Sequence, residues 1–132
     1  MQSGRYMSGH MAMTCVKKEM HRQFGDEILL EEKKYAWERH GWFLLKFRYI
    51  PKTYMIHFEG EFNCFNVRIT KDDDAYIVLK KLTDYSNDLT EKDLCDSIEK
   101  LKNVLKTKIA FYRSINGKLY QEINGEYKRI RR

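Results

Sequence analysis

The sequence predicts a single α+β domain. Its antiparallel sheet is expected to contain two meanders packed by an amphipathic helix, with a second helix at the N-terminus. Three patterns support this fold class. Apolar residues recur every three or four positions over 90–106, as in a helix with one buried face. Apolar and polar residues alternate through much of 42–70, as in half-buried strands. Two Asn-Gly pairs near the C-terminus are strong hairpin signals.

Chain length and composition fit one compact domain. The 132 residues include 42% hydrophobic and 14% aromatic residues, which is enough apolar surface for a core and excludes a wholly disordered chain. No apolar run approaches the length needed to cross a bilayer, so a membrane protein is not expected. Residues 1–13 lack periodicity, and Ser8-Gly9-His10-Met11 resembles a vector-derived sequence. We therefore expect a tail over 1–13 and a single domain over 14–132.

The first structured segment, 15–40, is expected to form one broken helix or two helices in series. Its first half carries a helical stripe formed by Val16, Met20 and Phe24. Asp26 is placed to cap the second half, in which acidic residues come early and basic residues late, as the helix dipole favours. Gly41 is the expected end of this helix.

Three strands of a first meander should follow. They are expected over 42–49, 54–58 and 62–70, separated by turns at Pro51-Lys52 and Gly60-Glu61. A fourth strand is expected over 75–82, although the spacing of apolar residues there also fits a helix.

The second helix and the second meander complete the predicted fold. Thr90 and Asp93 form a variant of the capping box that opens the helix over 90–106. Its apolar stripe consists of Leu94, Ile98, Leu101 and Leu105. Beyond it, strands over 109–115, 118–123 and 126–130 are expected to be joined by Asn116-Gly117 and Asn124-Gly125. This pair type tolerates the positive φ angles of a type I′ turn.

Enzymatic and metal-binding motifs are not found in the sequence. There is no nucleophile elbow, phosphate-binding loop or zinc-protease motif. Cys15, Cys64 and Cys95 are widely spaced, and no histidine accompanies a cysteine at ligand spacing, so we expect reduced thiols and no zinc. His57 and Glu59 could act as base and orienting group on one strand, but such pairs are usually ordinary surface neighbours. We predict a cytoplasmic, non-enzymatic protein without a cofactor.

Positive charge is concentrated at the C-terminal end. The chain carries a net charge of +6, and residues 107–132 hold seven basic residues against two acidic ones. Basic and aromatic side chains interleave there, as single-stranded nucleic-acid surfaces require. The candidate binding residues are Arg113, Lys118, Tyr120, Tyr127, Lys128, Arg129, Arg131 and Arg132. Two other interpretations stay open: the tyrosines pack internally, or the charge serves only solubility.

The element order, together with the segment Gly41-Trp42-Phe43-Leu44, resembles the small basic anti-CRISPR proteins of phages that infect low-GC Gram-positive bacteria, especially the broad-spectrum type II-A inhibitors. The resemblance implies an inhibitor that binds a Cas9-type ribonucleoprotein or its guide RNA stoichiometrically and blocks DNA recognition or cleavage. A basic chain would not act as an acidic mimic of DNA. The alternatives are a free-standing nucleic-acid-binding regulator and, less favoured, a toxin-immunity protein.

Overall fold

The computed structural model describes residues 6–72 and 75–130. In this part of the chain two α-helices, two short 3₁₀ segments and eight strands occur in the order α1 (Gly9–Phe24), η1 (Gly25–Glu27), β1 (Ile28–Ala36), β2 (Trp42–Tyr49), β3 (Tyr54–Glu61), β4 (Cys64–Thr70), β5 (Ala75–Val78), η2 (Leu79–Lys81), α2 (Glu91–Leu105), β6 (Tyr112–Ile115), β7 (Lys118–Ile123) and β8 (Glu126–Arg129). The α+β class and the N-terminal helix are confirmed. No helix among these residues is long and apolar enough to span a membrane.

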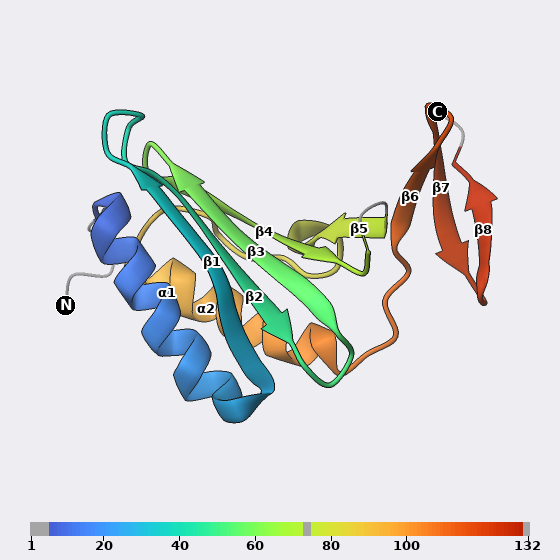
Figure 1. Cartoon of the computed structure of the whole chain (residues 1–132), viewed down its shortest axis with the longest axis horizontal. Helices are drawn as coiled ribbons and strands as arrows, with labels where there is room; N and C mark the ends of the chain where they lie inside the picture. Colours follow the sequence, from blue (N-terminus) through green and yellow to red (C-terminus); the bar gives the residue numbers. More distant parts are fainter. Residues whose placement is uncertain (1–5, 73–74, 131–132) are drawn as a thin grey trace.

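All eight strands belong to one antiparallel sheet, and each strand pairs with the next in the sequence. The strands that we expected as two meanders are therefore joined. The joint is narrow, because β5 and β6 pair only through Ala75 with Arg113 and Tyr76 with Tyr112. Figure 1 shows both helices against one face of the longer strands, whereas β6–β8 stand clear of the helices. We call β6–β8 the terminal arm.

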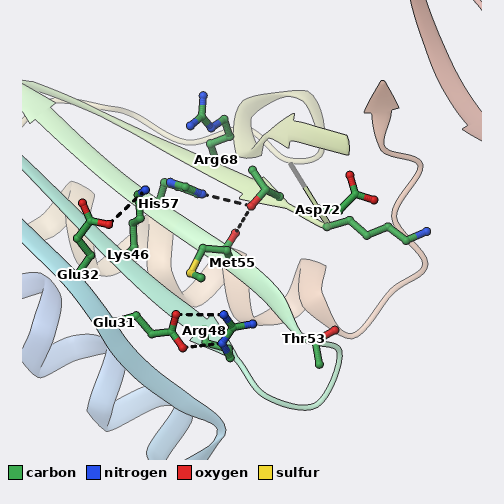
Figure 2. A pocket seen from close by; sticks show the side chains of 11 residues that line it. Glu31, Glu32, Lys46, Arg48, Thr53, Met55, His57, Arg68 and Asp72 are labelled. Atoms are coloured by element: carbon green, nitrogen blue, oxygen red, sulfur yellow. Dashed lines mark hydrogen bonds and ion pairs between the residues drawn. The ribbon is translucent and has the colours of Figure 1, made fainter. Parts of the chain in front are cut away.

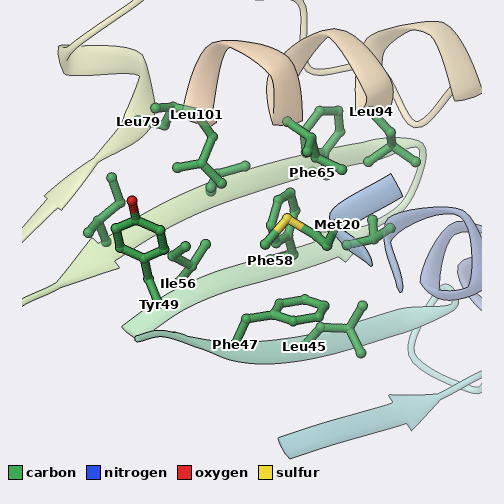
Figure 3. Packing of buried hydrophobic residues seen from close by; sticks show 14 of the residues in the cluster. Met20, Leu45, Phe47, Tyr49, Ile56, Phe58, Phe65, Leu79, Leu94 and Leu101 are labelled. Carbon is green, nitrogen blue, oxygen red and sulfur yellow. The ribbon is translucent and has the colours of Figure 1, made fainter. Parts of the chain in front are cut away.

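The core lies between the helices and the inner face of β2–β5. Alternate residues of these strands are buried, including Phe43, Phe58 and Val67. They meet the buried side chains of Met20 on α1 and Leu101 on α2 (Figure 3). Burying each large apolar side chain stabilises the fold by about 1.5–3 kcal/mol.

The predicted start and buried stripe of α2 agree with the structure. The side chain of Thr90 accepts a hydrogen bond from the backbone N–H of Asp93 at 3.2 Å. This bond satisfies one of the N–H groups that a helix start leaves without a backbone partner. The stripe residues Leu94, Ile98, Leu101 and Leu105 are all buried.

The helix predicted after Asp26 is wrong, because Ile28–Ala36 forms the edge strand β1. Pairing with β2 satisfies the backbone groups of β1 that point toward β2 and lets Ile28 and Leu30 pack against the core. The charge order that suggested a helix dipole has another cause. The acidic residues of β1 pair across strands, Glu31 with Arg48 at 2.6 Å and Glu32 with Lys46 at 3.4 Å.

The N-terminal helix starts earlier than its apolar stripe suggested. It begins at Gly9 rather than near Cys15, and the side chain of Ser8 caps it by accepting from the N–H of Met11 at 3.1 Å. Ala12 and Met13 are buried, so part of the segment that we set outside the domain contributes to the core. A Cβ on Gly9 would lie 2.0 Å from the carbonyl oxygen of Gly41, so this close approach requires glycine.

The predicted fourth strand is shorter than expected and passes at Leu79 into the 3₁₀ segment η2. The first strand of the arm begins at Tyr112, since Ile109 and Phe111 are buried in the core instead. Both Asn-Gly turns are confirmed. The φ angles are 53° and 78° at Asn116-Gly117 and 54° and 83° at Asn124-Gly125, as a type I′ turn requires.

Candidate nucleic-acid interface

The terminal arm has no buried core of its own, because every residue of β6, β7 and β8 is exposed or half-buried. A two- or three-stranded ribbon without a covered face is only marginally stable in isolation. Its apolar side chains are therefore accessible, with Ile115 38% and Ile123 40% exposed. The arm is thus a surface offered to solvent on both sides.

Strand register separates the predicted binding residues between the two faces of the arm. Arg113, Tyr120 and Arg129 are direct cross-strand partners and share a face. Lys118 and Tyr127 lie on the same side, since side chains alternate along a strand. We call these five residues the arm face. Lys128 points to the opposite side, and Arg131 and Arg132 lie outside the described residues.

Arg113 is held in place by contacts within the protein. Its guanidinium donates to Asp72 at 2.8 Å and to the hydroxyl of Tyr127 at 3.3 Å, and it lies 4.9 Å from the centroid of the Tyr127 ring. The hydrogen bonds to Asp72 and Tyr127 raise the pKa of Arg113. Arg113 therefore holds the Tyr127 ring in place and contributes a permanent positive charge to the arm face.

The other members of the arm face are available for contact. Lys118 and Arg129 are exposed, and the Tyr120 and Tyr127 rings are half-exposed. A ring that is neither buried nor covered by a helix can stack on a base, and neighbouring cations can meet phosphates. One acidic residue, Glu122, shares this side, and it forms an ion pair with Lys71 at 3.4 Å.

A second concave site lies on the sheet face opposite the helices, with a volume of about 430 Å³ (Figure 2). Outward-facing side chains of β1–β4 and of the β4–β5 turn line it. Its lining cations are Lys46, Arg48, Arg68 and Lys71, and its lining carboxylates are Glu31, Glu32 and Asp72. Among the residues that the structure describes, Arg68 forms no ion pair. It is therefore a cation accessible to an incoming anion.

His57 lies in the middle of this pocket, between the cross-strand neighbours Lys46 and Arg68. Burial and these two cations lower its pKa from 6.5 to about 4, so the imidazole is neutral at pH 7. The hydroxyl of Thr70 donates to the carbonyl of Met55, which leaves its oxygen to accept from His57 Nε2 at 3.2 Å. These bonds assign the proton to Nε2.

His57 and Glu59, which the sequence suggested as a base and its orienting group, do not bond to each other. Glu59 accepts a hydrogen bond from the indole of Trp42 at 2.6 Å, whereas His57 bonds to Thr70. Each group therefore has a structural partner of its own. Asp72 caps the turn after β4 by accepting a hydrogen bond from the N–H of Ala75 at 3.0 Å. Asp73 and Asp74, which follow it in the sequence, lie outside the described part of the chain.

Two ion pairs connect this pocket to the arm. Lys71 and Asp72 line the pocket and bind Glu122 and Arg113 respectively. The sequence pattern could not reveal the pocket, because Lys46, His57 and Arg68 are separated in the chain and become cross-strand neighbours only through strand pairing. The cations Lys46 and Arg48 at alternating positions of β2 are the one signal that could have suggested it.

No family model, no curated protein and no solved structure matches this chain.

Proposed function

We propose that the protein is a non-enzymatic binding protein that holds single-stranded nucleic acid on the arm face. The observation that carries this proposal is the register that brings Arg113, Tyr120 and Arg129 side by side on a sheet face that no helix covers. Sheet surfaces that stack bases on aromatic rings and meet phosphates with cations bind single strands in this way.

The charge distribution supports a polyanionic partner. The last 26 residues carry a net charge of +5, while the whole chain carries +6. A localised positive field attracts phosphate backbones and accelerates their association. Arg68, which forms no ion pair among the described residues, adds a cation in the adjoining pocket.

The resemblance to type II-A anti-CRISPR proteins suggests which nucleic acid this is. An inhibitor of a Cas9-type ribonucleoprotein would use the arm face on its guide RNA and would act by stoichiometric occupation. A free-standing regulator would bind free RNA or DNA with comparable affinity. These two roles share one surface chemistry and differ in the preferred form of the ligand.

The test is a titration of fluorescently labelled single-stranded RNA, single-stranded DNA and a guide-loaded Cas9-type nuclease at several salt concentrations. Arg129→Gln should weaken binding and lower the slope of log affinity against log salt by about 0.7 for one lost phosphate contact. Lys128→Gln is the matched control, because this neighbouring exposed residue lies on the opposite face of β8.

Equal affinity and equal salt slope for the parent and Arg129→Gln would contradict the proposal. Equal losses in Arg129→Gln and Lys128→Gln would indicate a diffuse charge effect without a defined face, and would also contradict it. Preference for the loaded nuclease over free RNA would favour the inhibitor, and the reverse preference would favour the regulator.

A further inference from the structure

A groove of about 330 Å³ lies between α1 and α2 and takes no part in the proposed nucleic-acid site. Its lining includes Met7, His10, Met11, Cys15, Glu91 and Cys95. Two of these side chains are thiols and two are thioethers, all of which are soft donors.

The two thiols come together although 80 positions separate them in the sequence. Cys15 comes directly before the buried Val16 on α1, and Cys95 comes directly after the buried Leu94 on α2. Packing of the helices brings both half-buried thiols to the lining of the same groove, close enough for each to shift the pKa of the other. Cys64 lies elsewhere, exposed at the start of β4.

The surroundings of the two cysteines disfavour a free thiolate. Burial, with smaller contributions from Cys95, Glu91 and Glu19, raises the pKa of Cys15 to about 12. A nucleophilic or redox-sensing cysteine needs the opposite surroundings, with a lowered thiol pKa. A soft metal ion would instead replace the thiol protons on binding.

We propose that Cys15 and Cys95 bind one Cu(I) ion, with the thioethers of Met7 and Met11 as additional donors. Thiolate and thioether ligands select Cu(I) over harder ions. In the part of the chain that the structure describes, no three His, Cys, Asp or Glu side chains form a metal-binding cluster, so a tetrahedral zinc site does not fit. A two-coordinate dithiolate needs only the pair that is present.

The binding step is a proton exchange without a change of oxidation state. One Cu(I) ion displaces one proton from each thiol, two Cu–S bonds form, and two protons pass to solvent. The complex gains a net charge of −1 at the two sulfurs, which Lys18 at the groove can partly compensate. No oxidant or reductant is consumed.

The test is an anaerobic titration of the full chain with Cu(I) in competition with a chromogenic Cu(I) chelator. We expect one ion per chain, with two protons released per ion in weakly buffered solution. Cys15→Ser/Cys95→Ser should weaken binding by more than about 100-fold, since changes outside the ligand set alone cost 10–100-fold. Cys64→Ser is the matched control and should retain the affinity of the parent.

Retained affinity in the double variant would overturn the proposal, as would an equal loss in Cys64→Ser. Circular dichroism of each variant verifies folding. X-ray absorption of the copper-loaded parent gives a second readout that needs no variant. Two or more sulfur neighbours support the site, whereas a shell of nitrogen and oxygen alone overturns it.

Discussion

The guanidinium of Arg113 on β6 donates a 2.8 Å hydrogen bond to Asp72 in the turn after β4. This contact braces the terminal arm at its narrow junction, where β5 and β6 pair at two positions only. The same guanidinium lies over Tyr127 on β8, two strands away. Arg113 therefore connects the sheet body, the first strand of the arm and its last strand.

Removing Asp72 should loosen the arm while the rest of the domain stays folded. Asp72→Ala deletes the Arg113 partner and the acceptor for the N–H of Ala75. We expect a local cost of about 1 kcal/mol, or about five-fold faster amide exchange in β6–β8. Hydrogen exchange with mass spectrometry measures this, with the exposed Asp26→Ala as control. If the variant accelerates amide exchange in β2 and β3 as much as in β6–β8, the effect is not local and the prediction is contradicted.

Leu101 should be essential to the core, because its side chain is fully buried between α2 and the sheet. Leu101→Ala should lower the free energy of unfolding by about 2–5 kcal/mol through lost burial and a new cavity. Leu101→Asp should abolish cooperative melting, since it buries an unpaired charge. Urea denaturation measures the loss in Leu101→Ala, and thermal melting tests Leu101→Asp, with Lys102→Ala as the control in both. A melting curve for Leu101→Asp like that of the parent would refute the packing of α2.

Gly9→Ala should destabilise the protein even though alanine is the better helix former. The added methyl group would collide with the carbonyl of Gly41 and push α1 away from the β1–β2 turn. Overpacking of this kind costs about 1–3 kcal/mol. Thermal melting measures the loss, and Met11→Ala on the exposed side of the same helix is the control. Stabilisation by Gly9→Ala would show that the helix does not meet the turn.

His57 should make stability depend on pH. Its folded pKa is lowered to about 4 by burial and by Arg68 and Lys46, with Glu32 and Glu59 opposing them. The unfolded chain therefore binds more protons between about pH 6.5 and pH 4, and stability falls as the pH falls through this window. His57→Gln should lose less stability than the parent between pH 7 and pH 4. His21→Gln, exposed on α1, should follow the parent, and parallel curves for His57→Gln would contradict the assignment.

Tyr120 should contribute to nucleic-acid binding through its ring. Tyr120→Ala should weaken binding by about 1–3 kcal/mol, or about five- to 150-fold, if a base stacks on it. Tyr120→Phe keeps the ring and should retain most of the affinity. Binding titrations with single-stranded RNA compare the two variants, and circular dichroism verifies the arm. Equal affinity of Tyr120→Ala and the parent would remove this ring from the interface.

Local patterns predicted the elements whose geometry depends on a few neighbouring residues. The Thr90 cap and the stripe ending at Leu105 defined α2, because a helix repeats within its own segment. The Asn116-Gly117 and Asn124-Gly125 turns defined the arm strands, because positive φ at both positions strongly restricts the residue types. The basic and aromatic composition of the arm was likewise evident, but its division into faces required the strand register.

What the sequence by itself determined is the α+β class, the second helix, the hairpin turns and the concentration of positive charge at the C-terminal end. Only the tertiary structure decided that Ile28–Ala36 is a strand, because its edge position beside β2 outweighs a charge order that fits a helix equally well. It also decided that Arg113 and Asp72 form a pair and that Cys15 and Cys95 line one groove. Contacts between residues far apart in the chain arise from packing and strand pairing, which no local pattern encodes.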